Sequence, residues 1–322
     1  MNLIGEHIDY LGFPVLPIAM NRHVSLDAAA GPDSVIRVAS AEYGVRSFEW
    51  TPNLPAGPAG DFGNNAMAAA RVVAAKWGIG PGIDGLITST LPAECGFGSS
   101  SALTIAVTLA LLEAQGVTPK FTELMEAMAG GTEHAVCLAG RRGCAMRASL
   151  APLRTEPEPI PGEWAFFVAH SLRRVEKSGA AWDEFRARRQ AALRGDAEAL
   201  RHAIGERARV EDAVYAMRRR DVDEFGRILY DSHCSLRDHL KVSCEAADRV
   251  VEACRAAGAC GARIAGTGFG GYVLAVCERK QVEETMARLD RDYFGGRAKR
   301  LEFPDYLMRV EAGPGALRPL DS

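Results

Sequence analysis

The spacing of apolar residues predicts a chain built from both strands and helices. Short runs of β-branched residues bounded by glycine or proline are typical of strands, and apolar residues that recur every three or four positions are typical of helices. Strands are expected within residues 15–30, 34–38, 85–90 and 165–169, and a strand, a tight loop and a second strand within 261–276. Helices are expected over residues 66–77, 100–115 and 121–139 and, in three or four pieces, over 178–257.

A proline-rich stretch, PLRTEPEPIP at residues 152–161, interrupts these patterns. Because a proline lacks a backbone N–H and blocks a helix, we expect a junction between two domains here. The pattern on both sides predicts an α+β fold of two unequal lobes, residues 1–160 and 161–322, with the cleft between lobes as the default place for a site.

Composition excludes several classes of function. The 322 residues are 48% hydrophobic and 25% charged, which is ordinary for a globular protein of about two domains. A net charge of -3 and the lack of aromatic residues among the basic runs argue against nucleic-acid binding. The eight cysteines form no CxxC pair, no signal peptide is visible, and no apolar run could span a bilayer. We therefore expect a cytoplasmic protein that binds neither nucleic acid nor membrane.

The segment LPAECGFGSSSA, residues 91–102, is a candidate phosphate-binding loop. It lies between a predicted strand and a predicted helix, where glycines allow close approach of a ligand and the helix N-terminus offers free N–H donors. Ordinary capping of a helix by serine explains the same residues equally well. The loop alone therefore leaves both interpretations open.

Two further motifs lie near the ends of the chain. The opening NLIGEHIDY puts Glu6, His7 and Asp9 within four residues, a set that could hold the hydroxyls of a sugar but also suits a charged turn. GTGFGG, residues 266–271, needs positive φ or close backbone contact, which a bulged hairpin would also explain. It is not a dinucleotide fingerprint, because no helix pattern follows it.

Together the three motifs resemble the galactokinase branch of the GHMP small-molecule kinases. GEHIDY is similar to that branch's sugar signature, and PAECGFGSSS to the family's ATP loop, PxxxGLxSS. Residues 232–244, SHCSLRDHLKVSC, nearly repeat the galactokinase phrase SHxSLRDxxEVSC. The resemblance covers essentially the whole chain.

The resemblance implies an ATP- and Mg²⁺-dependent kinase that phosphorylates O1 of galactose or a related hexose. It also implies an N-terminal lobe like domain 2 of ribosomal protein S5 and a ferredoxin-like C-terminal lobe. It assigns sugar contacts to Glu6, His7, Asp9, Phe185 and Gly268, nucleotide contacts to Gly96, Gly98, Ser99, Ser100, Ser101, Gly270 and Gly271, and magnesium ligands to Ser100 and Glu133.

The chain departs from the family where catalysis is expected. The family segment GxxCGIMDQ reads GRRGCAMRA here, so that the catalytic aspartate becomes Arg147, which cannot act as a base. The arginine of the family phrase APGR is absent, and the sugar-contacting tyrosine of YNxRR aligns with Phe185. Three accounts remain: a kinase that works by positioning, with Arg147 stabilising phosphate charge; a kinase for another hexose or a sugar acid; and a catalytically impaired homologue that binds sugar and ATP as a sensor or regulator.

Overall fold

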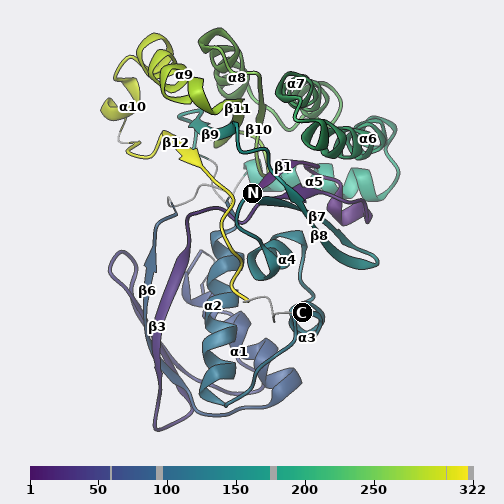
Figure 1. Ribbon diagram of the computed structural model, residues 1–322. Helices are drawn as coiled ribbons and strands as arrows, with labels where there is room; N and C mark the ends of the chain where they lie inside the picture. The colour runs from purple at the N-terminus through teal and green to yellow at the C-terminus, as the bar shows by residue number, and fades with distance from the viewer. Residues whose placement is uncertain (59, 92–96, 175–179, 302, 318–322) are drawn as a thin grey trace. The chain divides into compact units, whose positions relative to one another are not determined.

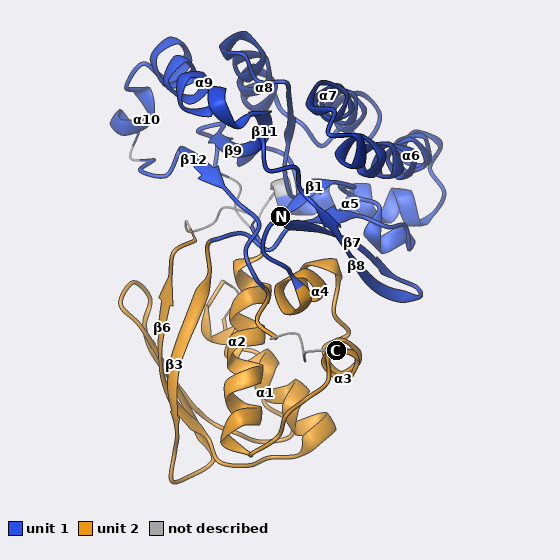
Figure 2. Cartoon of the chain, in the orientation of Figure 1, with its two compact units in different colours: residues 1–21, 92–97, 140–314 blue, residues 22–91, 98–139, 315–322 orange. Residues whose placement is uncertain are grey.

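The computed structural model describes residues 1–58, 60–91, 97–174, 180–301 and 303–317 (Figure 1). The chain forms two compact units that alternate along the sequence (Figure 2). Unit 1 comprises residues 1–21, 92–97 and 140–314, and unit 2 comprises residues 22–91, 98–139 and 315–322. The units are defined by compactness rather than by family domains, so the predicted boundary between residues 160 and 161 stays a prediction.

Unit 1 is built on a four-stranded antiparallel sheet in the order β10-β11-β9-β12. All seven residues of β9 are buried, which explains why this strand reads as a continuous apolar run without alternation. The strands span Trp164–His170 (β9), Gly261–Ile264 (β10), Tyr272–Glu278 (β11) and Leu307–Val310 (β12).

Helices occupy the connections of this sheet. Asp196 and Asp221 cap α6 and α7 by accepting the backbone N–H groups of Ala199 and Glu224. The order strand, helices, two strands, helix, strand is the ferredoxin-like arrangement that was predicted. The helices are α5 (Ala180–Leu193), α6 (Ala197–Arg219), α7 (Val222–Asp238), α8 (Glu245–Ala257), α9 (Val282–Leu289) and α10 (Arg297–Arg300), with short turns η2 (Arg279–Gln281) and η3 (Asp290–Phe294).

The rest of unit 1 consists of two small antiparallel pairs, β1-β2 and β7-β8. The proline-rich stretch, where we expected a domain junction, forms strand β8, in which Pro157 and Pro159 pair with Met146 and Cys144 of β7. A two-stranded sheet has only edges, where the missing N–H of proline costs no ladder hydrogen bond. The elements are β1 (Asn2–Ile4), η1 (Asp9–Leu11), β2 (Leu16–Pro17), β7 (Cys144–Leu150) and β8 (Leu153–Pro159).

Unit 2 has a four-stranded sheet in the order β3-β6-β4-β5, with the apolar helix α2 packed against β3 and α1. The strands are β3 (Val24–Ala30), β4 (Val35–Ser40), β5 (Gly44–Glu49) and β6 (Ile83–Ser89). The helices are α1 (Gly63–Trp77), α2 (Ser99–Ala114), α3 (Phe121–Ala127) and α4 (Thr132–Ala139).

In the part of the chain that the structure describes, no helix is both long and apolar enough to cross a membrane.

Candidate functional site

The opening motif forms a tight turn after β1. Gly5 and His7 both have positive φ, 100° and 61°, a conformation that favours glycine. A Cβ on Gly5 would lie 2.9 Å from the Cα and Cβ atoms of Val15, so only glycine fits there. Glycine therefore stands where the turn lies against the backbone and side chain of Val15.

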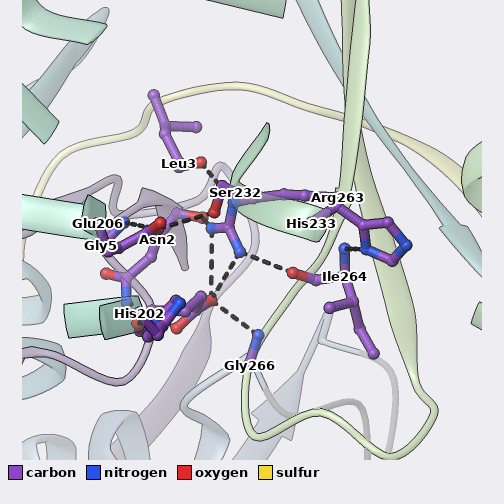
Figure 3. A network of polar contacts seen from close by, with 11 residues as sticks. Asn2, Leu3, Gly5, His202, Glu206, Ser232, His233, Arg263, Ile264 and Gly266 are labelled. Carbon is purple, nitrogen blue, oxygen red and sulfur yellow. Dashed lines mark hydrogen bonds and ion pairs between the residues drawn. The ribbon is translucent and has the colours of Figure 1, made fainter. Parts of the chain in front are cut away.

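The Glu6 carboxylate joins the first glycine motif to the third. Its Oε1 accepts the backbone N–H of Gly266 at 2.8 Å and lies 3.3 Å from Arg263 Nη1 (Figure 3). Its Oε2 accepts from Asn2 Nδ2 at 2.9 Å. Glu6 is 6% exposed, and protein donors already surround the carboxylate that was predicted to hold sugar hydroxyls.

Arg263 is fully buried and completes this junction. Its guanidinium donates to the carbonyl oxygens of Asn2, Leu3 and Ile264 at 2.5–2.8 Å. A buried arginine is stable only when its charge and its donors are all satisfied. Both strand β1 and the start of the glycine loop are thereby fixed to β10.

His7 is also buried, and neither of its ring nitrogens makes a hydrogen bond of ordinary geometry to a described residue, although the backbone of Thr267 lies near the ring. Burial lowers the pKa of His7 to about 4, so the ring is neutral at pH 7 and offers one donor and one acceptor. The ring lies 5.5 Å from that of Phe185 and 6.3 Å from that of Tyr10. The structure thus brings two of the predicted sugar-contacting residues, His7 and Phe185, together.

Asp9 begins the short helix η1, directly after the turn, and is half-buried. Its backbone carbonyl accepts the N–H of Gly12. The signature therefore presents its two acidic residues differently, with Glu6 inside the protein and Asp9 nearer the surface.

The GTGFGG loop connects β10 to β11 and is packed against Val242. A Cβ on Gly268 would lie 2.2 Å from the Val242 carbonyl oxygen, which accepts the Phe269 N–H at 2.7 Å. Gly268, Phe269, Gly270 and Gly271 all have positive φ. The glycines are therefore required by close contact as well as by the turn.

The phrase SHCSLRDHLKVSC, at the end of α7, supports both motifs. Ser232 Oγ donates to Glu206 at 2.8 Å, and His233 Nδ1 accepts the N–H of Ile264 at 3.3 Å. Ser235 Oγ lies 2.9 Å from Nδ1 of His202, whose Nε2 is 3.0 Å from the carbonyl oxygen of Glu6. Ser232, His233 and Ser235 of this phrase are thus buried and hold the backbone of the sugar signature and of β10.

Sequence reasoning missed His202, Glu206 and Arg263. His202 and Glu206 stand four residues apart on the buried face of α6, beside Ala203 and Val210. Polar residues at apolar positions of an amphipathic helix were the available signal.

The candidate phosphate loop is described from Phe97 onward, and Gly96 lies outside the described residues. The Phe97 ring is 8% exposed and lies 4.7 Å from the ring of Tyr272, the first residue after the GTGFGG loop. Tyr272 in turn packs edge-on against His170 at 4.6 Å. Within unit 1, this aromatic contact holds Phe97, in the middle of the candidate phosphate loop, beside β11, the strand that follows the glycine loop.

In unit 2, Gly98 occupies the N-cap of α2 with φ of 74° and has no side chain to cap the helix. Ser101 Oγ donates to Glu133 Oε2 at 3.2 Å, and a Cβ on Gly98 would lie 3.4 Å from the same oxygen. The structure thus brings the predicted metal ligand Glu133 to the helix N-terminus, where it meets Ser101. Ser99 and Ser100 form the first turn of the same helix.

Arg147, which was predicted to replace the family aspartate, lies on β7 and forms ion pairs with Glu156 of β8 and Glu211 of α6. The next residue, Ala148, exchanges two backbone hydrogen bonds with Val15, the residue that contacts Gly5. Arg147 is therefore adjacent in β7 to the residue that bonds to Val15 and so supports the turn of the sugar signature. Its guanidinium is balanced by two carboxylates and cannot take a proton from a hydroxyl.

Comparisons with known proteins agree with this architecture. The GHMP kinases N terminal domain matches residues 64–145, the GHMP kinases C terminal domain residues 213–294, and the galactokinase galactose-binding signature residues 1–29. Galactokinase of Chloroflexus aggregans is 28% identical over 91% of this chain and 86% of its own length, and human galactokinase is 26% identical over 92% and 86%.

Solved structures show the same fold. The crystal structure of Lactococcus lactis galactokinase complexed with galactose has a TM-score of 0.86 at 22% identity, covering 98% of this chain and 92% of that one. A mevalonate kinase structure has a TM-score of 0.68 at 17% identity, covering 96% of both chains. The chain belongs to the GHMP kinase family and carries the galactose-binding signature of galactokinases.

Proposed function

We propose that this protein is an ATP-dependent sugar kinase that transfers the γ-phosphoryl group to O1 of galactose or a closely related hexose. The observation that carries the proposal is the hydrogen bond from the Gly266 N–H to the Glu6 carboxylate. It joins the sugar signature to the glycine loop, two motifs that lie 260 residues apart. The galactokinase relatives and the matched signature support galactose as the first sugar to test.

On the sugar side, we assign direct contacts to His7 and Asp9, with Phe185 and Gly268 beside them. A neutral His7 can donate one hydrogen bond to a hydroxyl and accept another, and its burial without a protein partner leaves both capacities available. Glu6 acts one step away, because Gly266, Arg263 and Asn2 occupy its carboxylate.

On the nucleotide side, we assign the phosphates to the N-terminus of α2 and to Gly270 and Gly271. Helix N-termini bind anions through unpaired N–H groups and the helix dipole. Mg²⁺ prefers carboxylate, hydroxyl and phosphate oxygens, so Glu133 with Ser100 or Ser101 is a suitable protein contribution. When bound, Mg²⁺ would neutralise charge on the phosphates.

In the proposed reaction, the O1 oxygen bonds to the γ-phosphorus, the bond to the bridging oxygen breaks, and ADP leaves. The O1 proton passes to a phosphate oxygen or to water, because Arg147 cannot accept it. Phosphoryl transfer depends mainly on positioning and charge stabilisation, so a slow reaction is chemically possible without an aspartate at position 147.

A second candidate function is sugar and ATP binding without turnover. The ion pairs of Arg147 with Glu156 and Glu211 favour it, because they give the arginine a structural role at the position predicted for the family's catalytic carboxylate.

A coupled ADP-release assay with galactose, N-acetylgalactosamine, glucose and galacturonate separates the two candidates, with calorimetric ATP binding measured in parallel. Turnover of any sugar above the sugar-free rate excludes the second candidate, binding without turnover. ATP binding without turnover of any of the four sugars removes the kinase.

A further inference from the structure

Helix α6 carries a buried carboxylate that has no part in the binding roles assigned above. Glu206 has 0% exposure, and its Oε1 accepts both the backbone N–H of Gly5 at 3.0 Å and Ser232 Oγ at 2.8 Å (Figure 3). Its Oε2 accepts from Arg209 Nε at 2.8 Å. The group thus ends on the backbone of the sugar signature, about 200 residues away along the chain.

The bonded segment is the turn formed by Gly5, Glu6 and His7. Two of its three residues have positive φ, a backbone conformation that costs roughly 1–2 kcal/mol for a residue other than glycine. His7 can keep this conformation only if its surroundings hold it there.

Helix α6 holds the turn at two successive positions. Glu206 accepts the N–H of Gly5, and Nε2 of His202 donates to the carbonyl oxygen of Glu6. Since the carbonyl can only accept, the proton of His202 is on Nε2, and Nδ1 accepts from Ser235. One turn of α6 therefore fixes the backbone immediately before His7.

Burial alone would raise the pKa of Glu206, but nearby cationic groups, Arg209 and Arg263 among them, bring it below the usual value. The carboxylate is therefore ionised and acts as an acceptor at each of its contacts. A charge-assisted acceptor gives roughly twice the strength of a neutral one, which suits the holding of a strained turn.

We propose that Glu206 is a positioning residue for sugar binding: it holds the Gly5–His7 turn so that the unpartnered His7 ring meets the sugar. The inference rests on the proposed sugar binding and assigns Glu206 no contact with sugar or ATP.

The chain offers a matched control in strand β8, whose Glu158 contacts the same helix. Glu158 is 5% exposed and forms an ion pair with Arg218 of α6, but it bonds to no residue of the signature. E158Q therefore removes a buried charge from the same packing surface without touching the turn.

The experiment compares wild type, E206Q and E158Q by calorimetric titration with galactose and, separately, with ATP. We expect E206Q to weaken galactose binding about tenfold and ATP binding less than twofold, while E158Q changes each less than twofold. Equal weakening of both ligands by E206Q, or no weakening of galactose binding, would overturn the proposal.

A ligand-free measurement keeps this test independent of the proposed activity. Hydrogen–deuterium exchange of the peptide covering residues 1–11 should become at least fivefold faster in E206Q than in E158Q. Exchange that is the same in both variants contradicts the positioning role, whether or not the wild-type protein phosphorylates any sugar.

Should E206Q fail to fold, S232A, which removes one donor to Glu206 and leaves its charge, is compared with C234A, which alters an exposed neighbour on α7. S232A is then expected to accelerate exchange of residues 1–11 about threefold, and an effect equal to that of C234A counts against the proposal.

Discussion

The sugar-signature region of unit 1 and the helix-terminus region of unit 2 are built in contrasting ways. In unit 1, the turn before His7 is held by a buried network of charged side chains that includes Glu6, Glu206 and Arg263. In unit 2, the N-terminus of α2 offers backbone donors beside the exposed carboxylate of Glu133. A sugar needs hydrogen-bond partners for its hydroxyls at fixed positions, whereas several N–H donors at a helix N-terminus are enough to bind a phosphate. The first region should therefore lose stability when it is altered, and the second should lose nucleotide affinity.

The largest effect is expected from R263M. It removes the buried cation and leaves Glu6 without its charge partner, which should lower the free energy of unfolding by about 3–5 kcal/mol. Urea denaturation measures the change. R227M, at a 59% exposed arginine with two surface ion pairs, should change the value by less than about 0.5 kcal/mol. Equal effects of the two variants would show that the network is not what stabilises unit 1.

Two glycines of the same loop give the next comparison. G268A adds a methyl group 2.2 Å from the Val242 carbonyl oxygen at a φ of 87°, and should destabilise by about 2–4 kcal/mol. G271A has a similar φ of 70° but meets no described atom within 4 Å, and should cost only about 1–2 kcal/mol. If G271A is as harmful as G268A, close packing on Val242 is not the reason for the glycine.

The burial of His7 predicts a dependence of stability on pH. Its pKa is about 4 in the folded protein and 6.5 in the unfolded chain, so between these values the unfolded state binds the extra proton. Stability therefore falls as pH drops below 6.5, by about 2 kcal/mol from this residue by pH 5. H7Q should remove that share of the slope in denaturation at pH 7 and pH 5, whereas H23Q, at an exposed histidine, should leave the slope unchanged. An H7Q slope identical to that of wild type contradicts the burial of a neutral ring.

R147D tests the position predicted to correspond to the family's catalytic aspartate. If position 147 corresponds to the family aspartate, restoring the carboxylate should raise kcat about tenfold or more, since a general base contributes ~10²–10⁴-fold. R147A removes the guanidinium without adding a base and should not raise kcat. A rate for R147D that is unchanged or lower means that the alignment is wrong there or that Arg147 has a role of its own.

The smallest change in stability is expected in unit 2. E133Q should raise the KM for ATP in the presence of Mg²⁺ about tenfold and change the free energy of unfolding by less than about 0.5 kcal/mol, because the residue is exposed. E126Q, at another exposed carboxylate of unit 2, should leave the KM unchanged. If E133Q destabilises the protein without affecting ATP, Glu133 is a structural residue.

Much of the fold could be predicted because its elements have strong local signals. β9 is a continuous apolar run, α2 begins with three serines directly after Gly98, and GTGFGG lies between two strands. Strand β8 is not predicted from the sequence, because proline normally interrupts a strand, although an edge strand tolerates it.

The candidate site was only partly predictable, for a physical reason. The glycine motifs can be recognised in the sequence, because the residues with positive φ lie within a few positions of one another. The partners of Glu6 are not, since Arg263 and Gly266 are about 260 positions away and look like ordinary residues of a strand and a loop. Pairing of buried charges that are far apart along the chain leaves no local sequence pattern. Such pairing directs the Glu6 carboxylate toward Arg263 and Gly266.

The most direct test of the account is ³¹P NMR of the wild-type protein with Mg²⁺, ATP and galactose. We expect the γ-phosphate signal of ATP to decline while signals of ADP and of a phosphate ester on the anomeric oxygen increase, and no ester to form when galactose is omitted. An ATP spectrum that stays unchanged for days at a protein concentration that binds both ligands would contradict the account.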